Sequence, residues 1–479
     1  MTTVVRVPYV PGFARADTAG RAAKTAGRAL RERLPRSAQA LLPPKTTDRP
    51  DAVTAVEHTN AGRLPELTPI RVGRMAAGPF AFLRGSAGLM AHDLTTAPVT
   101  GIGAQLCGDA HAANFGLYGD ARGGLTIDLN DFDETLHGPW EWDLKRLATS
   151  LVLAGREAGA GEDTCLAAAR DAAGAYRRTL RLLAKLPVTD AWNAIADEEL
   201  VSHTDARDLL GTLERVAAKA RNNTSARFAA KSTVRTPDGG RHFIDAPPVL
   251  RRVPDAEAAA VITALGGYLD TLPDDRLPLL ARYAPHDVAF RVVGTGSVGL
   301  RSYVVLLLDH RGEPLILQVK EARASALAPH VAKAGFEVPE IPHEGRRVVL
   351  GQRRMQVVSD TLLGWATAHI PATGTAGDTR TTETAFQVRQ FRNRKGSVDP
   401  AALTGEQLDD YARMTGALLA RAHAHSADPR VLAGYCGKSE ALDDAMGSFA
   451  TAYADRTEAD HAELSAAIAG GRIAAERGV

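Results

Sequence analysis

The chain has 479 residues and a formal net charge of +1, which excludes a global electrostatic attraction to nucleic acid or to an anionic membrane. Its three scattered cysteines form no CxxC pair, so neither a disulfide framework nor a zinc knuckle organises the fold. Apolar residues make up 45% and charged residues 24%, and the length suits about two to four domains or one bilobal enzyme. We find no apolar run of about 18 residues and no signal-peptide core, and we therefore expect no membrane span and a cytoplasmic location.

Residues 1–50 are expected to form a basic N-terminal extension. Ten Lys and Arg residues stand against three acids in this segment. The pattern from Thr18 to Leu34 predicts a basic helix, which Pro35 would end. An anionic partner would suit this charge, but such segments are more often solvated, and we expect a solvated extension.

Residues 51–285 predict a mostly helical lobe, and residues 401–479 predict further helices that pack on it. Pro79 fits the first turn of a helix, where its missing N–H is tolerated. From 138 to 154, leucines recur at a spacing that puts them on one helix face.

The stretch 107–133, inside this lobe, is unusually rich in polar side chains among small and apolar ones. It contains Asp109, His111, Asn114, Asp120, Asp128, Asn130, Asp131 and Asp133. Carboxylate and amide oxygens suit a hard cation such as Mg²⁺. Capping and turn formation explain single Asp and Asn residues equally well, but the density favours a functional site.

Residues 286–400 predict a lobe that contains a sheet. Gly294, Gly296 and Gly299 form a GxGxxG motif, but a strand follows it, where a dinucleotide-binding turn would open a helix. A turn and another strand, which ends at Lys320, come next. A protein-kinase-like fold places glycines and a lysine in this way over ATP phosphates, whereas a plain meander is the alternative.

Two further expectations concern the remainder of the sheet lobe. A helix over residues 345–356 would place Glu344 or Gln352 where either could partner Lys320. Residues 367–385 are rich in Gly and Thr and predict a loop, and a strand is expected over residues 386–391.

Over nearly its whole length the chain resembles the bacterial family DUF2252. The resemblance rests on six segments: RMAAGPFAFLRG, LCGDAHAANFG, DLNDFDETLHGPWEWDLKRLA, VVGTGSVGLRSY, LQVKEA and LARAHAHS. This resemblance implies no particular activity.

A more remote resemblance links the stretch 107–133 to aminoglycoside and choline kinases. Gly108-Asp109 with Asn114 is similar to their HGDxxxxN catalytic loop, although Cys107 replaces the histidine. The segment from Asp131 to Asp133 is similar to their metal-binding IDFD segment, with Asp128 as a rival for the same role. Asp143-Leu144 matches the pair that opens their next helix. The Gly-rich loop here follows the catalytic loop, so the resemblance implies a circularly permuted order.

These resemblances imply an α+β, kinase-like bilobal fold with a small antiparallel sheet lobe and a larger helical lobe. They imply an ATP- and Mg²⁺-dependent phosphotransferase that acts on a hydroxyl acceptor, by phosphoryl or nucleotidyl transfer. Asp109 would be catalytic, and the metal ligands would be Asn114, Asp131 and Asp133. The phosphates would lie against Gly294, Gly296, Ser297, Gly299 and Lys320.

Two other functions stay open from the sequence. A metal-dependent hydrolase would use the cluster of Asp109, His111, Asp131 and Asp133 to activate water without a nucleotide. A non-catalytic protein would bind the nucleotide without turning it over.

Overall fold

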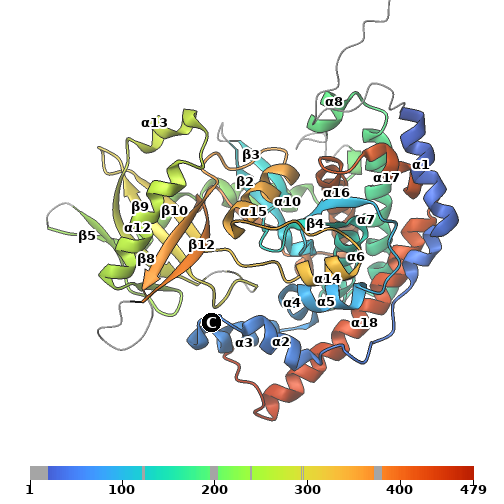
Figure 1. The fold of residues 1–479 in the computed structure, drawn as a ribbon, viewed down its shortest axis with the longest axis horizontal. Coiled ribbons are helices and arrows are strands. Elements are labelled where there is room, and N and C mark those ends of the chain that lie inside the picture. The colour runs from blue at the N-terminus through green and yellow to red at the C-terminus, as the bar shows by residue number, and fades with distance from the viewer. Residues whose placement is uncertain are drawn as a thin grey trace, which may run out of the picture.

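The computed structural model describes residues 20–120, 124–194, 203–237, 240–292, 294, 296–371 and 380–478. The chain is an α+β protein, about 51% helical and 16% strand, as expected from the sequence. Two bodies lie side by side in Figure 1, one built around a sheet and one mostly helical. None of the described helices is long and apolar enough to cross a bilayer.

The helical body is organised around α6 (Trp140–Glu157), whose buried side chains lie on every face of the helix. Long helices α7 (Glu162–Leu183), α16 (Gly405–Ala424) and α18 (Ala441–Ala469) surround it and share its apolar core. Shorter helices complete this body: α1 (Gly20–Arg33), α2 (Ala52–Asn60), α3 (Thr68–Met75), α4 (Pro79–Gly85), α5 (Ala87–Leu94), α8 (Val188–Asn193), α10 (Leu210–Arg221), α14 (Ala328–Lys333) and α17 (Pro429–Cys436).

Two small antiparallel sheets in the helical body carry the polar stretch. One pairs β1 (Gly103–Leu106) with β4 (Leu136–Pro139). The other has the order β13 (Gly396–Ser397), β2 (Phe115–Gly119) and β3 (Leu125–Leu129). Their strands are mostly buried, so the turns that follow β1 and β3 are held at fixed positions against the helical core.

The second body contains a six-stranded antiparallel sheet in the order β11-β12-β10-β9-β8-β7. The strands are β7 (Leu250–Arg252), β8 (Ala284–Arg291), β9 (Ser302–Leu308), β10 (Pro314–Glu321), β11 (Gly364–Pro371) and β12 (Thr381–Gln390). Packed on this sheet are α11 (Ser225–Ser232), α12 (Asp255–Leu269) and α15 (Glu344–Met355), with α13 (Leu277–Leu280) nearby and a hairpin of β5 (Thr233–Arg235) and β6 (Arg241–Phe243).

The division of the chain differs from the expected one at one boundary. Residues 225–285 belong with the sheet, because apolar residues of α12 and of the segment 229–250 share its two cores. The boundary at residue 285 was therefore too late. The predicted helices of 401–479 do pack on α6 and α7.

The described part of the N-terminal extension is not simply solvated. Helix α1 packs along α17, and Arg31 donates a 2.8 Å hydrogen bond to the carbonyl of Tyr435. The side chain of Arg49 is buried and makes ion pairs with Asp93 (2.6 Å) and Asp460 (2.5 Å). The basic charge of residues 20–50 is thus partly used inside the fold. Residues 1–19 lie outside the described part.

Asp128 and Arg421 form a fully buried ion pair between β3 and α16, with the two side chains 0% and 1% exposed. Asp128 also accepts a 3.1 Å hydrogen bond from the backbone N–H of Val357. Asp128→Ala would leave a buried guanidinium beside an apolar side chain, so we expect the free energy of unfolding to fall by about 3–5 kcal/mol. Chemical denaturation measures this change. Asp275→Ala, on the surface, is the control and should change stability by less than about 0.5 kcal/mol.

Candidate active site

The turn that follows β1 is fixed by backbone geometry and by one carboxylate. Gly108 has φ +81°, and a Cβ there would lie 2.2 Å from the carbonyl oxygen of Glu134, so only glycine fits. Asp143, in the first turn of α6, accepts hydrogen bonds from the N–H groups of Cys107 (2.7 Å) and Gly108 (3.0 Å). Asp143 therefore orients the residue that follows, Asp109.

Cys107 is a buried packing residue. Its Sγ lies 3.2 Å from the carbonyl oxygen of Asp131, and burial raises the pKa of its thiol well above the ordinary value. A thiol held neutral in this way is a poor nucleophile. At this position, where the kinases that the segment resembles have a histidine, the backbone of the turn is held by Asp143.

Asn114 ties the two halves of the polar stretch together. Its Nδ2 donates to the carbonyls of Asp109 (3.0 Å) and Asp131 (2.9 Å), and its Oδ1 accepts from the N–H of Asp131 (2.7 Å). The side chain is 3% exposed, and it also lines the large pocket described below. Oδ1 also accepts a longer hydrogen bond from the N–H of Asn130 (3.4 Å), so the amide fixes the backbone of this stretch and would have to give up that contact to bind a metal.

Asp109 is held by an arginine that the sequence did not single out. Nε of Arg146 donates to Asp109 Oδ1 at 2.6 Å, and Nη2 lies 2.5 Å from the same oxygen. Arg146 lies one helical turn after Asp143 on α6, so that two residues of the segment WDLKR fix both the backbone and the side chain of the turn. That i, i+3 spacing is the signal that could have identified Arg146.

His111 lies beside Asp109, with its Nε2 3.7 Å from Asp109 Oδ2. Burial lowers the pKa of His111 to about 4, although the charge of Asp109 works in the opposite direction. The imidazole is therefore neutral at pH 7, and the pair is a contact between a carboxylate and a neutral ring.

Lys320 on β10 reaches the polar stretch across 189 positions of sequence. Its Nζ lies 3.3 Å from Asp131 Oδ1 and 2.5 Å from Asp133 Oδ2. Burial alone would lower the pKa of Lys320, but the two carboxylates outweigh it and raise that pKa. Burial and the charge of Asp131 raise the pKa of Asp133. The three side chains form one charged cluster at the junction of the two bodies.

Helix α15 supplies a different contact from the one expected. Glu344 pairs with Arg347 at 2.5 Å, and Gln352 accepts a 3.0 Å hydrogen bond from Gln387, so both side chains are engaged away from Lys320. Arg347 donates to the carbonyls of Asp133 (2.8 Å) and Thr135 (2.6 Å). The helix therefore positions the backbone of the carboxylate segment instead of pairing with the lysine.

The Gly-rich loop between β8 and β9 lies over this cluster. Gly294 and Gly299 have φ of +67° and +87°, which side chains rarely adopt. The segment before α3 supports the loop, because Arg63 donates to the carbonyl of Val298 (2.7 Å) and Leu64 N–H donates to that of Gly299 (2.8 Å). Residues 293 and 295 lie outside the described part.

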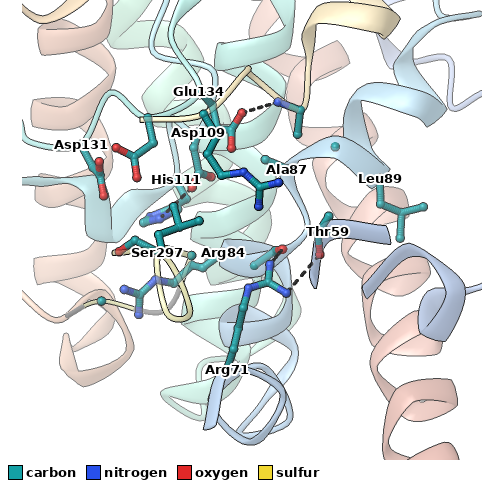
Figure 2. A pocket seen from close by; sticks show the side chains of 18 of the residues that line it. Thr59, Arg71, Arg84, Ala87, Leu89, Asp109, His111, Asp131, Glu134 and Ser297 are labelled. Carbon is teal, nitrogen blue, oxygen red and sulfur yellow. Dashed lines mark hydrogen bonds and ion pairs between the residues drawn. The ribbon is translucent and has the colours of Figure 1, made fainter. Parts of the chain in front are cut away.

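A pocket of about 760 Å³ lies between the loop and the polar stretch. Of the predicted site residues, Asp109, Asn114, Asp131, Asp133, Gly294, Gly296 and Ser297 line it. Gly299 faces Arg63 instead, and Lys320 lines a smaller pocket behind it. Figure 2 shows Asp109, His111 and Asp131 along one side of the large pocket, with Ser297 and Arg84 below them in that view.

The donor set fits a magnesium ion that is shared with a phosphate. No group of three or more His, Cys, Asp or Glu side chains stands ready for a metal among the residues that the structure describes. Asp131 and Asp133 nevertheless converge on one cation, the ammonium of Lys320. Mg²⁺ is commonly held by one or two carboxylates together with substrate phosphates and water, and two converging carboxylates meet that need.

Comparison with known proteins identifies a family for the chain. The family model described as "Uncharacterized protein conserved in bacteria (DUF2252)" matches residues 63–467, which include both the polar stretch and the Gly-rich loop. No curated protein and no solved structure matches the chain.

Proposed function

The chain belongs to the DUF2252 family, whose description names no activity, and from the site itself we propose an ATP- and Mg²⁺-dependent phosphotransferase that acts on a hydroxyl acceptor. The observation that carries the proposal is the contact of Lys320 with Asp131 and Asp133 beneath a Gly-rich loop. Phosphoryl-transfer enzymes need this combination, since their catalysis is mainly positioning and charge neutralisation.

The same observation supports a kinase-like bilobal arrangement in permuted order. β8, the Gly-rich loop, β9 and β10 form consecutive antiparallel strands, and the lysine lies on the third of them. Kinases also carry their phosphate-binding lysine on the third strand. Here the strands follow the catalytic turn along the chain, and the two motifs still meet at one pocket.

In this function Gly294, Gly296 and Ser297 lie along the phosphates, and Lys320 neutralises their charge. Asp131 and Asp133 would hold Mg²⁺, with Asn114 fixing the backbone of Asp131. Bound Mg²⁺ would supply neutralisation of the charge on the phosphate oxygens. Gly299 contributes the backbone turn of the loop, without facing the pocket.

Asp109 orients the acceptor hydroxyl and takes its proton as transfer proceeds. Its contact with Arg146 holds one carboxylate oxygen in place and leaves the other oxygen for the acceptor hydroxyl. The side chain is 22% exposed toward the pocket, so that an acceptor can reach it. A carboxylate that is held in this way can accept a hydrogen bond from the nucleophilic hydroxyl and position it.

The hydrolase alternative has less support from the geometry. A hydrolase would need Asp109, His111, Asp131 and Asp133 to converge on one point. Asp109 instead pairs with Arg146, whereas Asp131 and Asp133 converge on Lys320. A nucleotide-binding protein without turnover would use the same pocket. It would differ only in that ATP binds without being consumed, so substitution of Asp109 would change no rate.

Removal of the metal tests the cofactor assignment. We expect EDTA to weaken the affinity for ATP by about tenfold or more, because Asp131 and Asp133 would hold Mg²⁺ and the ion would neutralise phosphate charge. Asp131→Asn should reduce this dependence on Mg²⁺, whereas Asp120→Asn, at the end of β2, should keep it. Isothermal titration of ATP with and without Mg²⁺ measures both effects. Equal affinities for ATP in Mg²⁺ and in EDTA would contradict the assignment.

A further inference from the structure

A second pocket of about 220 Å³ lies behind Lys320 and adjoins the large one. The two pockets share Asp131, Gly294, Ser297, Arg389 and Lys395 as lining residues. Its remaining walls come from the ends of β8, β10 and β12 and from the turn that follows β12. A nucleotide that lies under the Gly-rich loop would therefore extend into this pocket from one end and into the large pocket from the other.

The small pocket is strongly cationic. It is lined by Arg291, Lys320, Arg389, Arg392 and Lys395, against one acid, Asp131. Apart from Lys320, none of these cations makes a salt bridge to any residue in the described part of the chain. A pocket with this balance of charge attracts anions.

The contacts of these cations are with neutral groups. Arg389 donates to Gln318 Oε1 (2.9 Å) and to the carbonyl of Asn130 (3.3 Å). The guanidinium of Arg291 lies 5.0 and 5.3 Å from the rings of Phe228 and Phe391, and its buried Nε has no hydrogen-bond partner. Arg392 lies over the ring of Phe391 at 5.2 Å. These neutral contacts orient the guanidinium groups, none of which makes a direct ion pair with a described residue. The carboxylates of Asp131 and Asp360 act on Arg389 and Lys395 only through longer-range electrostatic attraction.

Burial, and to a smaller extent the neighbouring cations, lower the pKa values of two of these groups. Burial, together with Arg392, lowers the pKa of Arg291 to about 10. Burial, together with Arg389, lowers the pKa of Lys395 to about 7, although Asp131 and the nearby Asp360 oppose this. An anion in the pocket would relieve this repulsion, and a neutral nucleobase would not.

We propose that the small pocket holds the terminal phosphates of the nucleoside triphosphate and that the nucleoside extends into the large pocket. Phosphate oxygens match the guanidinium donors of this pocket, whereas a nucleobase would leave them unpaired. The α-phosphate then lies nearest Asp131 and Asp109. This inference rests on the proposed function and selects nucleotidyl transfer within it.

The reaction follows from this orientation. The acceptor hydroxyl oxygen forms a bond to the α-phosphorus, and the bond from that phosphorus to the bridging oxygen of the β-phosphate breaks. The hydroxyl proton passes to Asp109, and pyrophosphate leaves from the cationic pocket with the electron pair of the broken bond. The products are a nucleotidylated acceptor, or AMP when water is the acceptor, and pyrophosphate.

Binding of Mg²⁺-tripolyphosphate and of AMP tests the orientation by titration calorimetry. In the variant Arg392→Gln/Lys395→Gln we expect tripolyphosphate and ATP to bind about tenfold or more weakly, with the affinity for AMP unchanged. Arg252→Gln, an exposed arginine of the same sheet, is the control and should bind all three like the wild type. Lys395→Gln alone serves if the double variant melts at a lower temperature.

Two results would overturn the proposal. The first is unchanged binding of tripolyphosphate in the variants, or a loss of AMP affinity equal to that of ATP. The second is the formation of ADP and phosphate instead of AMP and pyrophosphate during turnover of ATP by the wild type, which chromatography resolves. The second result would contradict the orientation but remain consistent with a phosphotransferase that transfers a phosphoryl group. Failure of ATP to bind at all would contradict both the proposed function and the proposed orientation.

Discussion

Asp109→Ala is expected to lower ATP-dependent transfer by about 10³-fold or more while ATP still binds with an affinity within about threefold of the wild type. A positioned group that orients the nucleophile and takes its proton supplies an effect of about 10²–10⁴, and Asp109 would contribute both functions. The phosphate contacts come from other residues, so binding should persist. Consumption of labelled ATP, with water or a nucleophile-containing extract as the acceptor, measures the rate.

Two variants separate chemistry from structure at this position. Asp109→Asn keeps a hydrogen-bond acceptor for Arg146 but removes the charge, and it should lose transfer nearly as completely as alanine does. Asp120→Ala changes an acid of the same stretch outside the pocket lining and should turn over like the wild type. Wild-type turnover in Asp109→Ala would contradict the role given to this carboxylate.

Lys320→Ala is expected to weaken ATP binding by about 100-fold and to lower turnover at least as much. The ammonium, on a side chain that is 3% exposed, contacts the carboxylates of Asp131 and Asp133 beneath the Gly-rich loop, and charge-assisted contacts to phosphate are among the strongest in proteins. Calorimetric titration of ATP measures the affinity. Lys219→Ala, which removes an exposed lysine from α10, should have no effect.

The result at Lys320 also discriminates between the functions. Full activity of Lys320→Ala on a substrate, without ATP binding, would support the metal-dependent hydrolase. If Lys320→Ala loses affinity for ATP and the wild type binds ATP without turning it over, the result would support the non-catalytic nucleotide-binding protein. The phosphotransferase requires both the affinity and the turnover to depend on this lysine.

Local patterns in the sequence predicted many of the helices and strands. The periodicity of residues 138–154 predicted α6, and the runs of β-branched, aromatic and other apolar residues after the GxGxxG motif predicted β9 and β10. The stretch 364–371 is different, because it alternates buried and exposed residues at the edge of the sheet and contains Gly, Thr and Pro. Its composition predicted a loop over 367–385, and that prediction was wrong over the parts that form β11 and β12.

The site shows a similar division. Asp109, Asp131 and Lys320 were identified because their motifs are short and local, and their proximity was expected only if two distant motifs built one site. Arg146, Arg347 and Arg389 were missed because an arginine among helical or strand residues carries no local signal of what it will contact. Their partners are determined by tertiary packing. Arg146 contacts the carboxylate of Asp109, whereas Arg347 and Arg389 contact the backbone carbonyls of Asp133 and Asn130.

Thermal melting with ATP and Mg²⁺ is the most direct test of the central claim, that this pocket binds Mg²⁺-ATP through Lys320 and the carboxylates. A ligand that binds only the folded chain raises its stability, and at millimolar Mg²⁺-ATP we expect the melting temperature of the wild type to rise by about 2 °C or more. The same addition should leave the melting temperature of Lys320→Ala unchanged. A wild-type melting temperature that does not move with millimolar Mg²⁺-ATP would contradict the account.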